Sequence, residues 1–192
     1  MATATLDMTS TLPPTRPETP LTVDRIVLTG FMGSGKSTAG RLLADHLGWR
    51  FLDLDEEIER REGRSVPQIF AESGEPQFRR LESAALATLL GHRRVVVALG
   101  GGAPEELGNR LLLEQTPHTA VVYLAAPFEV LVNRCRDQKD AVERPVLANL
   151  ELAAKRFESR RRIYARIASH SVETSALSEF ETVQAVLEAL RG

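Results

Sequence analysis

A glycine-rich segment near the start of the chain carries the clearest chemical signal. Residues 30–37 are Gly-Phe-Met-Gly-Ser-Gly-Lys-Ser, which fits the pattern G-x-x-x-x-G-K-[ST]. Glycines let backbone N–H groups converge on phosphate oxygens, and the start of a following helix adds its positive dipole end. Lys36 would place a cation beside the β- and γ-phosphates, and the Ser37 hydroxyl is suited to Mg²⁺. The segment predicts a nucleoside triphosphate site, against the alternative of a turn that binds nothing.

Two carboxylates follow the next apolar run. Asp53 and Asp55 stand two residues apart at the expected end of a strand over residues 49–54. Residues two apart on a strand point the same way, so both side chains would face one side, where open α/β sheets bind ligands. One carboxylate could hold Mg²⁺ through water while the other accepts a hydrogen bond from an acceptor hydroxyl. A solvated acidic loop, or a helix N-cap made by Asp55, is the structural alternative.

Arginines and a glycine triplet are candidates for binding a second ligand. Arg79 precedes Glu82 by three residues on an expected helix, a spacing that would orient its guanidinium toward a substrate carboxylate. Glycines 100–102 follow a buried strand and would let a ligand approach the backbone. Arg160 stands one helical turn before Tyr164. A surface ion pair, a plain turn and a solvated basic face are the respective structural alternatives.

The segment 136–148 is polar, charged and without hydrophobic period. Such a stretch inside a domain predicts a mobile functional loop rather than a packed connection. Arg134 and Arg144 flank or enter it. A loop that carries arginine over phosphates would exclude water and neutralise charge during phosphoryl transfer.

The elements around these residues alternate between short apolar runs and amphipathic segments. This alternation predicts a parallel sheet covered by helices on both faces. We expect strands at 26–29, 49–54, 95–99, 120–124 and near 171–172, and helices at 37–47, 56–61, 66–70, 78–89, 105–113, 128–134, 150–167 and 180–190. Residues 1–22 are rich in Thr and Pro and lack apolar periodicity, which predicts a disordered tail before one domain over 23–192.

Composition excludes several classes of protein. The 192 residues are 43% hydrophobic and 26% charged, with a net charge of −2, which argues against a charge-driven nucleic-acid or membrane binder. No apolar run is long enough to span a bilayer. The single Cys135 permits no internal disulfide, which fits a reducing cytoplasm, and the four histidines lack metal-ligand spacing.

Taken in order, these motifs resemble those of the shikimate kinase family over about residues 25–192. The markers are Gly-Phe-Met-Gly-Ser-Gly-Lys-Ser-Thr at 30–38, Phe-x-Asp-x-Asp-x-x-Ile-Glu at 51–59, Gly-Arg-Ser-Val at 63–66, Ile-Phe at 69–70, Gly-Glu-x-x-Phe-Arg-x-x-Glu at 74–82, the glycines at 100–102, Arg-Pro-Val-Leu at 144–147 and Arg-x-x-x-Tyr at 160–164. The resemblance implies a three-layer α/β fold of the P-loop nucleoside-monophosphate-kinase type, with five parallel strands ordered 2-3-1-4-5. It implies Mg²⁺-dependent transfer of the ATP γ-phosphate to the 3-hydroxyl of shikimate, a step of aromatic amino acid biosynthesis.

The resemblance also implies roles for individual residues. Lys36, Asp55 and Arg144 would be catalytic; Gly33, Ser34, Gly35, Lys36, Ser37, Thr38, Arg134 and Arg144 would bind ATP, with Arg134 against adenine; Asp55, Arg79, Gly101 and Arg160 would bind shikimate; Ser37 and Asp53 would hold Mg²⁺. The segment 172–176 lacks an arginine that some relatives place near adenine, so backbone groups around Ser175 are expected there instead. We expect ATP and shikimate as the partners of a cytoplasmic monomer that binds neither nucleic acid nor membrane.

Two rival functions share much of this pattern. A gluconate kinase of the same fold also takes an acceptor with a carboxylate and several hydroxyls, but Asp-x-Asp, Phe-Arg-x-x-Glu and the glycine triplet argue against it. A non-catalytic regulatory module would be expected to have lost a phosphate-loop or carboxylate residue, or to carry a DNA-binding segment. Lys36, Ser37, Asp53 and Asp55 are all present, and residues 1–22 are too short and too rich in proline for a helix-turn-helix.

Overall fold

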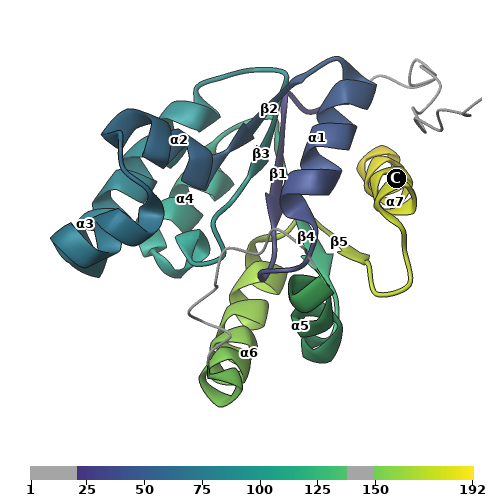
Figure 1. Cartoon of the computed structure of the whole chain (residues 1–192). Coiled ribbons are helices and arrows are strands. Elements are labelled where there is room, and N and C mark those ends of the chain that lie inside the picture. The colour runs from purple at the N-terminus through teal and green to yellow at the C-terminus, as the bar shows by residue number, and fades with distance from the viewer. Residues whose placement is uncertain (1–20, 138–148) are drawn as a thin grey trace, which may run out of the picture.

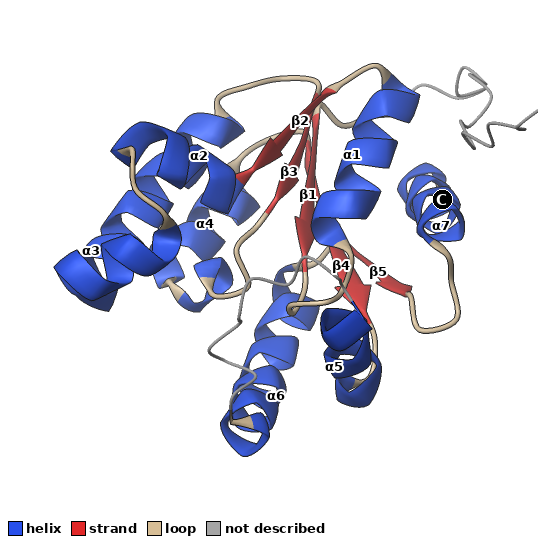
Figure 2. Cartoon of the chain, in the orientation of Figure 1, coloured by secondary structure: helices blue, strands red, loops and turns tan. Residues whose placement is uncertain are grey.

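Five short strands form the centre of the structure, a computed structural model that describes residues 21–137 and 149–192. They are β1 (Arg25–Thr29), β2 (Arg50–Asp53), β3 (Val95–Ala98), β4 (Thr119–Ala125) and β5 (His170–Glu173). Every pairing is parallel and the order is β2-β3-β1-β4-β5, which confirms the predicted topology (Figure 2). β1 and β3 bury all their side chains, as strands do in a parallel sheet covered on both faces.

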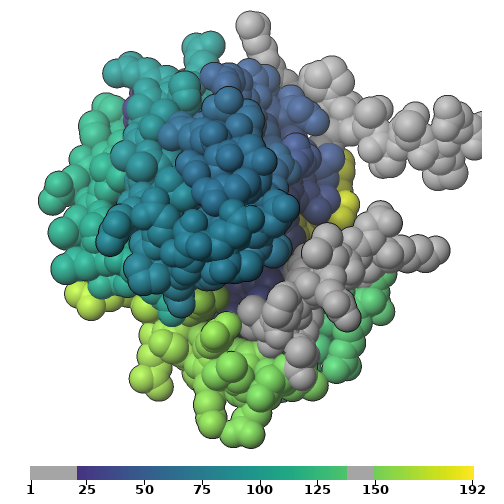
Figure 3. Space-filling view, turned by 60° about the vertical axis from the view of Figure 1, so that its left-hand side comes forward, coloured from purple at the N-terminus to yellow at the C-terminus, as the bar shows by residue number. Residues whose placement is uncertain are grey.

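Helices cover both faces of this sheet (Figure 1). They are α1 (Lys36–Leu47), α2 (Leu54–Glu62), α3 (Val66–Leu90), a 3₁₀ turn η1 (Ala103–Glu105), α4 (Leu107–Gln115), α5 (Phe128–Asp137), α6 (Leu150–Ile167) and α7 (Glu179–Arg191). Alternation along β1 divides the core: Val27 packs with residues of α2 and α3, while Ile26 and Leu28 pack with residues of α1 and α7. In the space-filling view, α2 and α3 form the broad surface above α6 (Figure 3).

Three expected helices have different bounds in the structure. The segments expected at 66–70 and 78–89 lie in a single assigned helix, α3, that is interrupted at Gly74, where φ is +76°. Pro76, two residues later, lacks the N–H that a continuous helix would use, so the interruption has a local cause. The helix expected over 105–113 is divided into η1 and α4, because Glu106 between them has an extended backbone.

The ends of the expected segments fall partly outside the described residues. Leu21 and Val23 are partly buried against the α1–α7 side of the core, so packing begins before residue 23. Residues 1–20 of the expected tail and 138–148 of the expected loop, including Arg144, lie outside the described part of the chain. Within the residues that the structure describes, no helix combines the length and apolar character that crossing a membrane requires.

Candidate functional site

The phosphate loop joins the end of β1 to the start of α1. Gly30, Gly33 and Gly35 have φ values of +149°, +77° and +84°, which side-chain-bearing residues rarely adopt. Gly35 occupies the N-cap of α1 without any side-chain hydrogen bond to the helix. The first amides of α1 are therefore left for an anion such as a phosphate.

The loop lies directly against α5. A Cβ added to Gly33 would come within 2.4 Å of the Leu131 carbonyl oxygen and 2.8 Å of the Cys135 Sγ. Glycine at position 33 is required by this close approach as well as by its φ. The contact also gives the buried Cys135 a packing role behind the loop.

Lys36 extends across the loop from the first residue of α1. Its Nζ donates to the carbonyl oxygens of Gly30 at 2.9 Å and Phe31 at 3.0 Å. These bonds hold the ammonium over the concave side of the glycine-rich backbone. A lysine at this position presents a point charge to phosphate oxygens.

Asp53 and Asp55 do not share a strand, so the expected strand-based alignment of the two carboxylates is wrong. β2 ends at Asp53, which is the N-cap of α2 and accepts from the backbone N–H groups of Asp55 at 3.0 Å and Glu56 at 3.5 Å. The aspartate that caps the helix is thus Asp53, and the proposed Asp55 cap is also wrong. The other Asp53 oxygen accepts a 2.7 Å hydrogen bond from Ser37 Oγ. The two aspartates still reach one cavity, because the turn into α2 redirects Asp55.

That cavity has a volume of about 440 Å³ and brings together several of the expected residues. It is lined by Met32, Gly33, Gly35, Lys36, Ser37, Thr38, Asp53, Asp55, Leu99, Gly100, Gly101 and Arg160. Ser34 is buried beneath it, where its hydroxyl lies 3.5 Å from Lys36 Nζ. Arg79 and Arg134, which were also expected at the site, do not line this cavity, which lies at the carboxyl ends of β1, β2 and β3.

Asp55 is the buried acid of this cavity. Burial, reinforced by the nearby Asp53 charge and opposed by Lys36, raises the pKa of Asp55 to about 6. A Cβ at Gly100 would lie 2.8 Å from Asp55 Oδ1, so the glycine triplet makes room for the carboxylate. With a pKa near 6, Asp55 is ionised at neutral pH yet close enough to it to exchange a proton.

Arg79 and Arg160 lie over the other two glycines of the triplet. A Cβ at Gly102 would come within 2.6 Å of Arg79 Nη2, and one at Gly101 would lie 3.7 Å from Arg160 Nη1. Tyr164, one turn beyond Arg160, donates to the Gly101 carbonyl oxygen. The triplet is thus the platform on which two guanidinium groups rest, rather than a plain turn.

Three glutamates contact these guanidinium groups, and sequence reasoning found only one of them. Glu82, expected as the orienting residue, is buried and accepts from Arg79 Nη1 at 2.8 Å. Glu75 accepts from Arg79 Nη2 at 3.0 Å, and Glu105 accepts from Arg160 Nη2 at 2.6 Å. Burial raises the pKa of Glu82 to about 7, against the lowering effect of Arg79. Glu75 could have been found from its i,i+4 spacing to Arg79, but nothing local links Glu105 to Arg160.

Arg134 connects α5 to the segment after β5. Its guanidinium donates to Thr174 Oγ1 at 3.1 Å and to the carbonyl oxygens of Thr174 and Ser175. Arg134 and Ser175, both expected near adenine, are thus adjacent. Thr174 was not singled out from the sequence, although its buried hydroxyl also bonds the Ala125 carbonyl at the end of β4.

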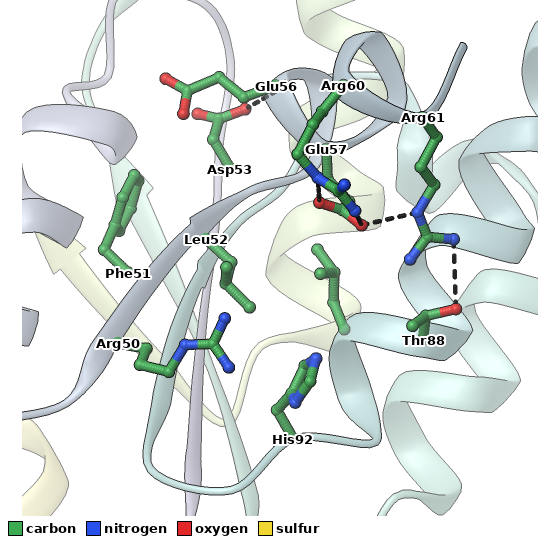
Figure 4. A pocket seen from close by; sticks show the side chains of 11 residues that line it. Arg50, Phe51, Leu52, Asp53, Glu56, Glu57, Arg60, Arg61, Thr88 and His92 are labelled. Carbon is green, nitrogen blue, oxygen red and sulfur yellow. Dashed lines mark hydrogen bonds and ion pairs between the residues drawn. The ribbon is translucent and has the colours of Figure 1, made fainter.

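A second cavity, of about 420 Å³, lies beside β2, α2 and α3 (Figure 4). Three of its charged residues pair with one another: Glu57 accepts from Arg60 at 2.8 Å and from Arg61 at 2.6 Å. These hydrogen bonds, Arg60 first, lower the pKa of Glu57 to about 2. The cavity shares only Asp53 with the residues around the phosphate loop, so the loop-lined cavity is the candidate active site.

Comparison with known proteins points to one family. The family model for shikimate kinase matches residues 32–191. A shikimate kinase of Persephonella marina is 40% identical over 167 residues, covering 86% of this chain and 98% of the relative.

Two solved structures show where the fold is shared. A shikimate kinase from Acinetobacter baumannii, solved in complex with shikimate, superposes with a TM-score of 0.77 at 36% identity, covering 86% of this chain and 92% of that chain. A gluconokinase from Sinorhizobium meliloti 1021 superposes with a TM-score of 0.61 at 20% identity, covering 90% of this chain and 94% of that chain. At 20% identity the second likeness concerns the fold alone.

Proposed function

The chain belongs to the shikimate kinase family, and from this premise we propose that its loop-lined cavity transfers the γ-phosphate of ATP to the 3-hydroxyl of shikimate. The observation that carries the proposal is that Lys36, Asp55 and Arg160 all line one cavity. A phosphate-binding group, a hydroxyl-binding carboxylate and a carboxylate-binding guanidinium are what this reaction requires of its site. The family is ATP-dependent, which places the chain among the phosphotransferases with an alcohol acceptor.

The phosphate loop is proposed to bind ATP through residues 33–38. The positive φ values at Gly33 and Gly35 turn backbone N–H groups toward the loop interior, and the start of α1 adds its dipole. When ATP binds, Lys36 would replace its hydrogen bonds to the loop carbonyls with hydrogen bonds to phosphate oxygens. Arg134 is proposed to pack against adenine beside backbone groups of Ser175, and Arg144 to contact the phosphates.

Ser37 and Asp53 fit a magnesium ion. Their hydroxyl and carboxylate oxygens lie 2.7 Å apart at the loop, and both are hard donors of the kind Mg²⁺ prefers. Among the described residues no group of three His, Cys, Asp or Glu could hold a metal ion, which suits an ion completed by phosphates and water. When bound, Mg²⁺ would neutralise charge on the transferring phosphate.

Asp55 is proposed to accept the proton of the attacking hydroxyl. It lies in the cavity with Lys36 and opens onto the glycine triplet, so it can contact an acceptor lying between the phosphate loop and the triplet. Arg79 and Arg160 would bind the acceptor carboxylate, and the Gly101 backbone would contact its ring. Phosphoryl transfer needs little covalent chemistry from the protein, so orientation and charge stabilisation provide most of the rate acceleration.

Neither rival function is favoured by an observation at this site. The gluconokinase likeness is confined to the fold, while the relatives with higher identity are shikimate kinases. A ligand-binding regulatory module would not need Ser37, Asp53 and Asp55 arranged around one loop. We further propose a cytoplasmic monomer that binds neither nucleic acid nor membrane, consistent with the net charge of −2.

The proposal is tested by measuring ADP release with Mg-ATP and shikimate, gluconate or no acceptor. We expect saturable release that depends on shikimate, with gluconate close to the background without acceptor. Release with gluconate alone would favour the other kinase. Folded, ATP-binding protein that releases no ADP with either acceptor would favour the regulatory module.

A further inference from the structure

Glu105 places a carboxylate where the two substrate-facing arginines converge. Its Oε2 atom lies 2.6 Å from Arg160 Nη2 and 3.9 Å from Arg79 Nη2. The residue ends η1, the 3₁₀ turn that follows the glycine triplet directly. A side chain of this chain thus makes the contacts that the carboxylate of an acceptor would make.

Carboxylates already outnumber the two arginines without a ligand. Arg79 and Arg160 face three carboxylates, those of Glu75, Glu82 and Glu105. An anionic acceptor has to compete with one of them, because each added negative charge weakens the attraction for the next.

Glu105 has the carboxylate that a ligand can displace from the arginines most easily. Glu82 is only 1% exposed, so it cannot leave Arg79 without burying an unpaired charge, and Glu75 contacts Arg79 alone. Glu105 contacts both arginines and is 36% exposed, while the arginines are 14% and 13% exposed. The Glu105 carboxylate can therefore be hydrated when it leaves the arginines.

The contact with Arg160 is also incomplete. Arg160 Nε is buried and has no hydrogen-bond partner within residues 21–137 and 149–192. Glu105 thus satisfies one edge of the guanidinium and leaves another donor unpaired. A ligand carboxylate that binds two nitrogens would satisfy the group more fully.

We propose that Glu105 is a specificity-determining residue that occupies the acceptor-carboxylate subsite and competes with the substrate carboxylate for Arg79 and Arg160. The inference rests on the proposed function, which assigns these arginines to the acceptor. Glu105 weakens the binding of a carboxylate acceptor without touching the reacting oxygen. Its removal therefore changes KM and leaves kcat, which depends on Asp55 and the phosphate loop.

The test compares Glu105→Gln with the unsubstituted protein on shikimate and on its uncharged methyl ester. We expect the KM for shikimate to fall roughly two- to five-fold, the range for a partly exposed ion pair. The KM for the ester should fall less than that for shikimate, because the Glu105 carboxylate does not repel an uncharged group. We expect kcat to stay within about two-fold, because Glu105 does not touch the reacting oxygen. A Glu105→Ala variant should give the same pattern, which separates loss of the carboxylate from a new contact by the amide.

The matched control is Glu106→Gln, which removes the same charge from the next residue. Glu106 is exposed and makes no ion pair among the described residues, so its KM for shikimate should not change. A higher KM for shikimate in both Glu105 variants would overturn the inference, because Glu105 would then be supporting Arg160. An equal fall in KM for acid and ester would overturn it as well. If the unsubstituted protein does not turn over shikimate, the proposed function fails and the inference fails with it.

Discussion

At the scale of the residue, Asp55 has to remain charged in a place that disfavours charge. Burial and Asp53 raise its pKa, and Lys36 alone among the loop residues opposes them. An acid held in this way is a stronger proton acceptor than an exposed aspartate, at some cost in stability. We propose that Asp55 accepts a proton from the acceptor hydroxyl and holds that hydroxyl in position.

Asp55→Asn should lower kcat by a factor of about 10²–10⁴, because the amide can orient a hydroxyl but cannot accept its proton. Thermal unfolding of the variant should show no loss of stability, since an uncharged amide replaces a buried charge. ADP release at saturating shikimate measures the first effect and circular dichroism the second. A folded variant with near-normal turnover would show that Asp55 is not the proton acceptor.

Glu82 gives a prediction for the dependence of stability on pH. Its pKa is raised from 4.5 to about 7 in the folded protein, chiefly by burial. Between these values the folded state holds a proton that the unfolded state has lost, so the free energy of unfolding falls as pH rises through this window. Glu82→Gln removes that contribution. The stability of Glu82→Gln relative to the unsubstituted protein should therefore rise by about 1–3 kcal/mol between pH 5 and pH 8.

Urea unfolding of the two proteins at matched ionic strength measures this difference. Glu75→Gln is the control, because Glu75 contacts the same arginine but is exposed. A difference in stability that stays constant from pH 5 to pH 8 would mean that Glu82 titrates at its ordinary pKa.

At the scale of the element, the junction between β2 and α2 explains both the success and the failure of the sequence prediction. Leu54 prolongs the apolar run after Phe51, so periodicity alone places residue 54 in the strand. The overlooked signal is Asp53 with Glu56 three residues later, a spacing typical of a helix N-terminus. Asp53 and Asp55 still line one cavity, because a strand end and a helix start occupy the same edge of a parallel sheet.

The packing of α5 against the phosphate loop is testable by a pair of glycine substitutions. Gly33 and Gly35 both have positive φ, but a Cβ would meet the Leu131 carbonyl only at Gly33, and nothing lies within 4 Å of one at Gly35. Both Ala variants bear the strain of a left-handed residue, of about 1–2 kcal/mol. Gly33→Ala should lose about 1–3 kcal/mol more, because the α5 backbone must move.

The free energy of unfolding of both variants in urea, without ATP, provides the comparison. Equal losses at the two positions would contradict the close approach of α5. The buried Cys135 Sγ, also within reach of that Cβ, gives a second check, since Gly33→Ala should make this thiol react faster with a thiol reagent.

At the scale of the whole molecule, alternation of strands and helices was enough to predict a parallel sheet covered on both faces, while the strand order came from the resemblance to the family. Contacts between residues distant in sequence could not be predicted. The pair of Glu105 and Arg160 spans 55 residues, and that of Arg134 and Thr174 spans 40. Such pairs depend on how η1, α5 and α6 pack in the folded protein, and no local sequence pattern specifies that packing.

We also predict where the folded domain begins. Leu21 and Val23 pack against the core beside α1 and α7, whereas the Thr/Pro-rich residues before them lack apolar periodicity. Deletion of residues 1–20 should leave the unfolding free energy and shikimate turnover unchanged. Deletion of residues 1–23 should lower the unfolding free energy by about 1–3 kcal/mol, through loss of two partly buried apolar side chains. Urea unfolding and ADP release distinguish the two, and a destabilised first deletion would contradict the expected tail.

The central claim is that one cavity directs the γ-phosphate of ATP to a single hydroxyl of shikimate. Its most direct test is phosphorus–proton correlation NMR of the product formed from Mg-ATP and shikimate. We expect one phosphomonoester, with its phosphorus coupled to the proton on the carbon that bears the 3-hydroxyl. Phosphate on another hydroxyl, or inorganic phosphate as the only new product, would contradict it.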